Sequence, residues 1–333
     1  MKVLIVGGVA AGTKTAAKLK REDRNAEVVV ITKDKDISYA GCGLPYYVGG
    51  LIESRDELIV NTPQKYAGLT GVEVKTGKEA VGLNADRKEI TVRDTETGTE
   101  EICSYDKLVL AVGASPAVLP VPGTDKQGVF KMRTPDDAIQ IRSYAEEHQV
   151  KKAVVIGAGF IGLEAAENLK AKGIQVTVID FASQILPNIL DEEMAAYAKK
   201  HLLKEGIRVI TGTKAEEILG DSEVTGVKTS AGVLGCELLI MAAGIRPNTD
   251  FLTDSGIEMF RGTILVDHTM QVWRMFMRQE TVLWSQTGSQ ENLSGLRWAH
   301  LPIWKEEHWR RFFPAKKKLI RVSWEPEWLS FPD

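Results

Sequence analysis

The first 271 residues of this 333-residue chain contain no tryptophan, and the whole chain has only three cysteines. Cys42, Cys103 and Cys236 stand far apart, which excludes a disulfide framework and a cysteine metal cluster and favours a reducing cytoplasm. No apolar run is long enough to cross a bilayer, and the N-terminus lacks the layout of a signal peptide. A net charge of −3 provides no basic field for nucleic acid. We therefore expect a cytoplasmic protein without a membrane, nucleic-acid or metal partner.

Two segments of the chain share one plan, which is an apolar strand, a glycine turn, a helix and a second strand. The first begins at Lys2 and turns at residues 7–12, and the second begins at Ala153 and turns at residues 157–162. A strand, a glycine turn and a helix in this order form a βαβ unit of the dinucleotide-binding type. Because the strands are continuously apolar, we expect parallel sheets that are covered on both faces.

Two later strands end in similar exits and indicate how the units are connected. Residues 107–112 lead to Gly113 and residues 238–242 lead to Gly244, so both glycines are candidates to contact a cofactor. The repeated order predicts an α/β fold with two Rossmann-like, three-layer domains, the second inserted into the first. The expected domains are residues 1–113 with 244–271, and residues 114–243.

The second glycine turn has the full dinucleotide pattern. Gly157 would make the tight turn, Gly159 would let the backbone approach a pyrophosphate, and Gly162 would let the helix pack on the strand. Phosphates bind at such a helix N-terminus because free N–H groups and the helix dipole favour anions. Asp180 ends the next strand, where its carboxylate can accept both ribose hydroxyls and would repel a 2′-phosphate. No Lys or Arg follows within residues 181–184, so the pattern favours NADH over NADPH.

The first glycine turn departs from this pattern at two places. Val9 takes the middle glycine position, and Thr32, rather than an acid, ends the second strand, with Asp34 close by. The glycines that remain as candidates for cofactor contact are Gly7, Gly8 and Gly12.

Cys42 lies in a segment that is rich in glycine and is followed by Pro45. Proline suits the first turn of a helix, so Cys42 is expected near a helix N-terminus, a position that favours the nucleophilic thiolate. A lone cysteine is most often part of an inert core, but this setting favours a reactive thiol. Cys103 and Cys236 lack such a setting, and we expect them to be structural.

These features together resemble the FAD-dependent pyridine nucleotide–disulfide oxidoreductases over about residues 1–271. The specific match is the segment Ser-x-x-x-Cys-Gly-x-Pro-Tyr-Tyr around Cys42, which follows the first glycine turn. Within this family the chain is most similar to the coenzyme A-disulfide reductase branch, whose neighbours are NADH oxidase and NADH peroxidase. The resemblance implies FAD on the first domain and NAD(P)H on the inserted one. It also implies that Cys42 cycles between a thiolate and a mixed disulfide with coenzyme A, and that full-length relatives are homodimers.

The resemblance assigns roles to further residues. Phe160 matches an aromatic gate between nicotinamide and flavin, and Glu164 matches an acid near their contact. On the residues alone, core packing and a solvated helix position explain these two equally well. Ala10 stands where the oxidases and peroxidases have a histidine that handles peroxide or oxygen, so peroxide chemistry is disfavoured. NADH oxidase and persulfide reductase activities remain alternatives, and a non-catalytic nucleotide-binding remnant is an alternative of another class.

A basic stripe on the first helix is the candidate substrate-binding site. Lys14, Lys18 and Arg21 follow helical spacing on one face, where they could meet the phosphates of coenzyme A. Arg21 and Ser38 stand where the reductase branch contacts coenzyme A, whereas Lys14 and Lys18 differ from that branch. A solvated charged face explains the stripe equally well.

Residues 272–333 are a different kind of sequence. They hold all seven tryptophans and 10 Lys and Arg against 7 Asp and Glu, whereas the other 271 residues hold 32 against 38. The net charge is therefore +3 in this part and −6 in the rest. The family's third flavin motif, Tyr-Ala-x-Gly-Asp, and its dimerisation domain do not follow. We expect an out-of-frame tail and an incomplete FAD domain with weak or absent flavin, which puts dimerisation in doubt.

A frameshift between about Gln271 and Trp273 would explain this tail, and the nucleotide sequence tests it. If the arginines use CGN codons, regrouping the codons of residues 272–281 one nucleotide earlier permits Val-Ala-Asp-Val-Tyr-Ala-Ala-Gly-Asp, which contains the missing motif. The same shift over residues 298–307 permits Met-Gly-Ser-Ser-Ala-Asn-Met-Glu-Gly, which is similar to the family's next segment. We expect the gene to carry this overlapping reading, and a gene that lacks it would mean a genuine C-terminal module.

Overall fold

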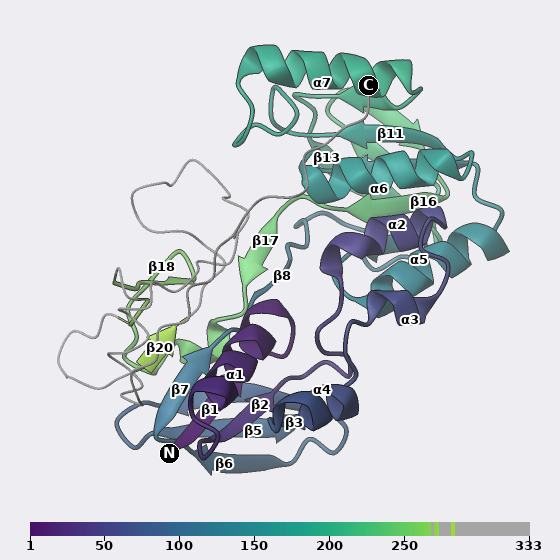
Figure 1. Ribbon diagram of the computed structural model, residues 1–333. Helices are drawn as coiled ribbons and strands as arrows, with labels where there is room; N and C mark the ends of the chain where they lie inside the picture. Colours follow the sequence, from purple (N-terminus) through teal and green to yellow (C-terminus); the bar gives the residue numbers. More distant parts are fainter. Residues whose placement is uncertain (268–269, 273–280, 284–333) are drawn as a thin grey trace. The chain divides into compact units, whose positions relative to one another are not determined.

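The computed structural model describes residues 1–267, 270–272 and 281–283. Its first sheet has five parallel strands in the order β20-β7-β1-β2-β3 (Figure 1). In chain order these strands are β1 (Lys2–Val6), β2 (Glu27–Ile31), β3 (Glu73–Lys75), β7 (Lys107–Leu110) and β20 (Thr281–Leu283). β1 and β2 are buried along nearly their whole length, as expected for parallel strands that are covered on both faces.

Helices cover one face of this sheet and a small antiparallel sheet covers the other. The helices are α1 (Ala10–Glu22) and α4 (Pro63–Thr70), and the antiparallel strands are β4 (Lys78–Asn84), β5 (Glu89–Asp94) and β6 (Glu100–Ser104). Successive side chains of a strand point to opposite faces. Leu4 accordingly shares a buried cluster with Leu83 and Ile90 of the antiparallel sheet, whereas the side chain of Ile5 lies beside Gly12 of α1. The first fold therefore has three layers.

The second sheet repeats this plan with five parallel strands in the order β12-β11-β10-β16-β9. In chain order these are β9 (Val129–Lys131), β10 (Lys152–Ile156), β11 (Gln175–Ile179), β12 (Arg208–Ile210) and β16 (Leu238–Met241). The helices are α5 (Pro135–Glu147), α6 (Phe160–Ala171) and α7 (Glu192–Lys204), and the antiparallel strands are β13 (Ala215–Leu219), β14 (Gly226–Thr229) and β15 (Gly232–Gly235). β10 lies between β11 and β16, just as β1 lies between β2 and β7.

Two short antiparallel strands carry the chain between the two folds. β8 (Ala114–Pro116) follows β7, and β17 (Ile245–Pro247) follows β16. They pair with each other, with Ala114 opposite Pro247, so the chain leaves the first fold and returns to it at one place. The predicted fold class, with two Rossmann-like three-layer folds and the second inserted into the first, is confirmed.

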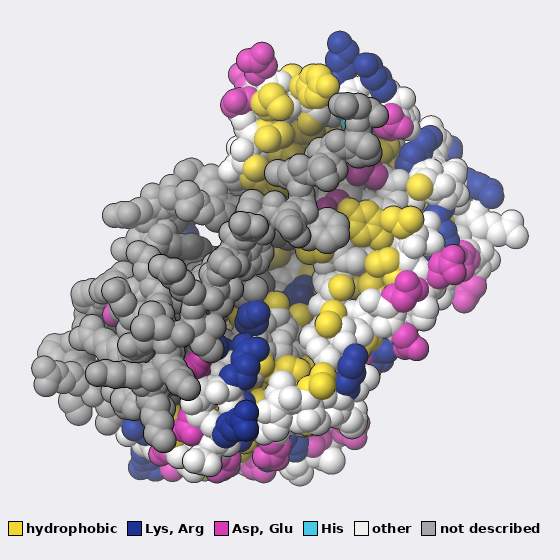
Figure 2. Space-filling model, in the orientation of Figure 1, with side chains coloured by type: hydrophobic (Ala, Val, Ile, Leu, Met, Phe, Trp, Pro, Cys, Tyr) yellow, Lys and Arg dark blue, Asp and Glu magenta, His cyan; other side chains and the backbone are white. Residues whose placement is uncertain are grey.

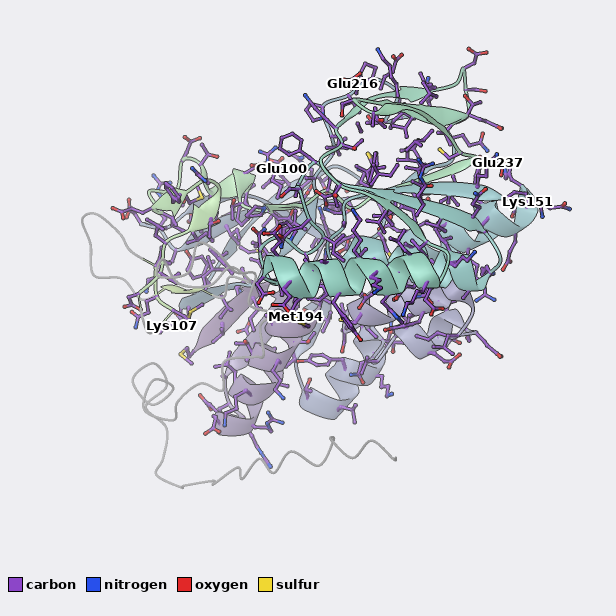
Figure 3. All side chains as sticks on the ribbon, turned by 90° about the horizontal axis from the view of Figure 1, so that it is seen from above. Glu100, Lys107, Lys151, Met194, Glu216 and Glu237 are labelled. Atoms are coloured by element: carbon purple, nitrogen blue, oxygen red, sulfur yellow. The ribbon has the colours of Figure 1, made fainter. Side chains whose placement is uncertain are left out.

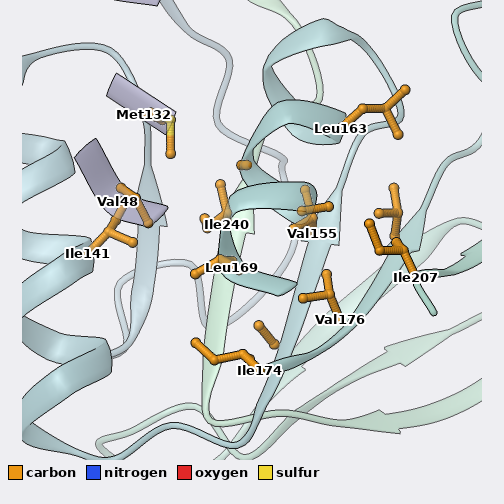
Figure 4. Packing of buried hydrophobic residues seen from close by; sticks show 14 of the residues in the cluster. Val48, Met132, Ile141, Val155, Leu163, Leu169, Ile174, Val176, Ile207 and Ile240 are labelled. Carbon is orange, nitrogen blue, oxygen red and sulfur yellow. The ribbon is translucent and has the colours of Figure 1, made fainter. Parts of the chain in front are cut away.

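The helix that follows Cys42 packs into the core of the second fold, although its sequence lies between β2 and β3. The short elements here are η1 (Gly41–Gly43), α2 (Leu44–Gly49) and α3 (Arg55–Leu58). Val48 of α2 belongs to the same buried cluster as Ile141 of α5 and Leu169 of α6 (Figure 4). Arg142 strengthens this contact, because its Nη1 donates to the carbonyls of Tyr47 (3.4 Å), Ile52 (3.3 Å) and Glu53 (3.2 Å).

After β17 the structure describes η2 (Asp250–Leu252), β18 (Met259–Phe260), β19 (Thr263–Ile264) and an isolated bridge between Val266 and Val272. β20 lies beside β7, with Thr281 opposite Leu108. Sequence analysis assigns no strand to β20, so this strand is an addition to the predicted architecture. The rest of the predicted tail, residues 273–280 and 284–333, lies outside the described residues. None of the helices in the described ranges is long and apolar enough to cross a membrane.

The glycines of the second turn differ sharply in the space around them, which gives a stability prediction. A methyl group on Gly162 would lie 1.9 Å from the carbonyl oxygen of Gly157, whereas one on Gly159 would meet nothing within 4 Å. We expect Gly162→Ala to lower the free energy of unfolding by about 3 kcal/mol, because the backbone at Gly157 or at Gly162 must shift to make room for the methyl group. The control Gly159→Ala should cost about 1 kcal/mol or less, the effect of a poorer N-cap residue. Urea unfolding followed by circular dichroism measures both, and equal losses would contradict the prediction.

Candidate active site

One cavity is lined by both glycine turns together with Cys42 and Glu164. The predicted cofactor residues that line it are Gly7, Gly8, Asp34, Gly113, Gly157, Gly159, Phe160, Asp180 and Gly244. The fold thus gathers residues from the ends of several parallel strands, which is where open α/β sheets bind their ligands. The other two predicted cofactor residues, Gly12 and Gly162, lie beneath the turns.

The first turn depends on Gly7 for two reasons. Gly7 has a φ of +112°, and a methyl group on it would lie 2.1 Å from the carbonyl oxygen of Ala111. Gly12 lies under this turn, because a methyl group there would be 1.8 Å from the carbonyl oxygen of Gly7. Thr32, which stands where an acid was expected, is buried, and its methyl carbon lies 3.0 Å from where a Cβ on Gly8 would be. Thr32 therefore packs against Gly8 of the turn. Its side chain has no carboxylate that could accept a hydrogen bond from a ribose.

The second turn holds the acid that the sequence predicts. Gly157 has a φ of +112°, and a methyl group on it would lie 2.3 Å from the carbonyl oxygen of Ala242. The Asp180 carboxylate accepts hydrogen bonds from the backbone N–H of Ala158 (2.6 Å) and of Ala182 (2.8 Å). Each oxygen keeps a further lone-pair site, so the carboxylate is oriented and can still accept ribose hydroxyls.

The helices that begin at these two turns lack the side-chain caps of the other long helices. Side chains of Thr62, Thr134 and Asp191 cap α4, α5 and α7. Among the described residues, no side chain caps α1 or α6, and neither has an acidic residue in its first turn. Their first N–H groups and positive dipole ends remain for an anion. The two turns therefore fit the pyrophosphates of two dinucleotides.

Asp34 contributes a carboxyl to the first end of the cavity. Burial raises the pKa of Asp34, while the nearby charges of Lys33 and Arg133 oppose that rise. The carboxyl is thus partly buried and lies near two positively charged side chains. It remains our candidate for the ribose partner that Thr32 does not supply.

Cys42 is exposed and lies in η1, one residue before Gly43, the N-cap of α2. Pro45 occupies the first turn of α2, as the sequence predicts. The other two cysteines have different surroundings. Burial raises the pKa of Cys236 to about 12, and burial together with Glu101 raises the pKa of Cys103.

Glu164 and Phe160 both come from α6 and both line the cavity. Burial, with a smaller effect of Glu167, raises the pKa of the Glu164 carboxyl. A carboxyl with a raised pKa keeps its proton to higher pH, which suits a group that holds or moves a proton.

The predicted substrate-binding residues lie outside the lining of this cavity. Figure 2 shows Lys and Arg side chains along α1, where Lys14 and Arg21 are exposed and Lys18 pairs with Glu22 at 2.5 Å. Ser38 has a φ of +48°, and its N–H donates to the carbonyl of Gly8. The role of these four residues stays a prediction. In the described ranges, no group of three or more His, Cys, Asp or Glu could hold a metal ion.

Sequence analysis missed Arg133, which lines the cavity from the loop before α5. Its Nε donates to the carbonyl of Ala114 (2.8 Å), and its Nη1 donates to the hydroxyl of Tyr39 (3.0 Å). Arg133 therefore ties the exit of β7 to the residue three places before Cys42. No motif surrounds Arg133 in the sequence, so only the folded chain reveals this link.

The geometry agrees with comparison to known proteins. The model of the pyridine nucleotide-disulphide oxidoreductase family matches residues 1–275, so the chain belongs to this family. The predicted family is thus confirmed, and the predicted cofactor pair, FAD and NADH, is the pair that this family uses.

Individual relatives bear different names. The chain is 38% identical over 271 residues to the NADH oxidase of Methanocaldococcus jannaschii. This match covers 81% of this chain and 60% of the relative. It is 33% identical over 271 residues, with the same coverage, to the coenzyme A disulfide reductase of Staphylococcus epidermidis. A structure of an NAD-dependent persulfide reductase from A. fulgidus matches with a TM-score of 0.80 and 34% identity, over 86% of this chain and 53% of that one. The chain spans about 60% of the length of these curated relatives.

The three cysteines should differ in reactivity toward a thiol reagent. Cys42 is exposed, whereas the raised pKa values keep Cys103 and Cys236 protonated at pH 8, and a thiol is a poor nucleophile. We expect iodoacetamide at pH 8 to label Cys42 first and Cys236 only after unfolding. Peptide mass spectrometry over time measures the order, with Cys42→Ser as the control. Early labelling of Cys236 would contradict the structure.

Proposed function

We propose that this chain is a flavin-dependent NADH:disulfide oxidoreductase in which Cys42 is the redox-active thiol and coenzyme A disulfide is the substrate. The observation that carries the proposal is that exposed Cys42 lines the cavity that both glycine turns line. We assign FAD to residues 1–113 with 244–271, and NADH to residues 114–243.

Each dinucleotide has a set of residues that would hold it. Residues 7–12 at the start of α1, with Asp34 and Gly113, would hold FAD. The residues that would hold NADH are those of the second turn, 157–162, with Asp180 and Gly244. A bound flavin would supply the relay that takes a hydride from the nicotinamide and passes on an electron pair.

The proposed work of Cys42 is thiol–disulfide exchange. Its thiolate attacks one sulfur of the substrate disulfide, forms a mixed disulfide and releases the other half as a thiolate. Two electrons that come from NADH then break the mixed disulfide, which releases the second thiolate and restores Cys42. For each NADH oxidised, one disulfide and one proton are consumed and two thiols are formed. Glu164, with its raised pKa, is our candidate to hold a proton beside this chemistry.

The choice of coenzyme A disulfide as the substrate rests on the segment around Cys42 and on the cationic face of α1, where phosphates could bind. Relatives named NADH oxidase and persulfide reductase match as well, so oxygen or a persulfide is the alternative oxidant. Ala10, which lines the cavity and carries no titratable group, disfavours peroxide chemistry.

Replacing the thiol tests the proposal. In Cys42→Ser the hydroxyl cannot form a mixed disulfide, so we expect NADH-dependent reduction of coenzyme A disulfide to fall at least about 10³-fold. NADH binding, measured by calorimetry, should be unchanged, and Cys103→Ser is the matched control that should keep activity. Turnover that persists in Cys42→Ser would remove Cys42 from the mechanism.

The visible spectrum of the purified chain, recorded before and after addition of NADH, distinguishes a flavin-dependent enzyme from a non-catalytic nucleotide-binding remnant. A flavin band that NADH bleaches would support hydride transfer by this chain. A colourless chain that still binds NADH would favour the alternative of a non-catalytic nucleotide-binding protein.

A further inference from the structure

Phe181 follows β11 and is 79% exposed, although its side chain is large and apolar. It lines the same cavity as Gly159 of the second turn and as Asp180, the residue before it in the sequence. Exposing an aromatic ring to water is unfavourable, so a ligand that covers the ring gains binding free energy from its burial. We propose that Phe181 is the platform on which the adenine ring of the nucleotide stacks, an inference that rests on the proposed NADH site.

The backbone holds Phe181 in place from both sides. The N–H of Thr213 donates to the carbonyl of Asp180 (2.8 Å), and the N–H of Gly212 donates to the carbonyl of Ala182 (2.7 Å). The Asp180 carboxylate also accepts the N–H of Ala182. Because the backbone on each side is fixed, stacking on Phe181 would have to order the phenyl ring but not the loop that carries it.

The surroundings of Phe181 favour a base over an apolar protein surface. Asp180, Lys214 and Glu216 line the same cavity. Figure 3 shows Glu216 on the small antiparallel sheet that contains β13. A docked apolar helix would desolvate these charges, whereas an adenosine offers a flat ring to the phenyl group and hydroxyls to the carboxylate.

A matched control stands nearby in the sequence. Tyr197 of α7 is also a highly exposed aromatic residue, at 71%, but it is not among the residues that line the cavity. Truncating it removes a similar exposed ring without touching the proposed platform.

The test is the calorimetric affinity of the purified full-length chain for NADH and for ADP-ribose, which has the adenine but no nicotinamide. Phe181→Ala should raise both dissociation constants by the same factor, about tenfold or more, as expected for one base–aromatic stack. Phe181→Tyr keeps the ring and should stay within about twofold of the wild type. Tyr197→Ala should change neither constant.

The outcomes separate this inference from the proposed function. If Phe181→Ala binds both ligands as the wild type does, or if Phe181→Tyr is as weak as Phe181→Ala, the platform is overturned while the NADH site stands. If the wild type binds neither ligand, the NADH site and the platform are both overturned. Equal melting temperatures of the variants would show that a loss of affinity is local to the site.

Discussion

The arrangement of the cavity depends on two close approaches of backbone to backbone. The carbonyl of Ala111 lies against Gly7, and the carbonyl of Ala242 lies against Gly157, at distances that leave no room for a side chain. Each turn is also held from the other side, because the N–H of its first glycine donates to the end of the neighbouring strand (2.8 Å in both). Both turns are therefore fixed by strands on either side, and the helix N-termini behind them point at one cavity.

The likeness of the two folds extends beyond their glycines. Ser38 has a φ of +48° and donates its N–H to the carbonyl of Gly8 (2.9 Å), whereas Leu186 has a φ of +47° and donates to the carbonyl of Ala158 (3.0 Å). Both residues lie in the loop after the second strand of a βαβ unit, Ser38 after β2 and Leu186 after β11. A non-glycine residue in this conformation costs about 1–2 kcal/mol, which the surrounding hydrogen bonds must offset. The repeated device anchors each loop to its turn.

Much of the fold and part of the site follow from local sequence. The glycine turns, Asp180 and the position of Cys42 before a helix depend on residues close together in the chain, so their patterns are readable. Arg133 and the packing of α2 on α5 and α6 depend on contacts between distant residues, and nothing near them in the sequence signals either. β20, which pairs with β7, was missed for a different reason, because it lies in residues 272–333, which sequence analysis interpreted as an out-of-frame tail.

The packing of α2 has a mechanical consequence for the thiol. Arg142 and the shared core attach α2 to the second fold, while the N–H of Ser38 attaches the start of the same segment to the first. A rigid-body rotation of one fold against the other about β8 and β17 would carry Cys42 along with α2. The few residues between Ser38 and Cys42 would then absorb the displacement, so the sulfur would move with the second fold rather than with the first.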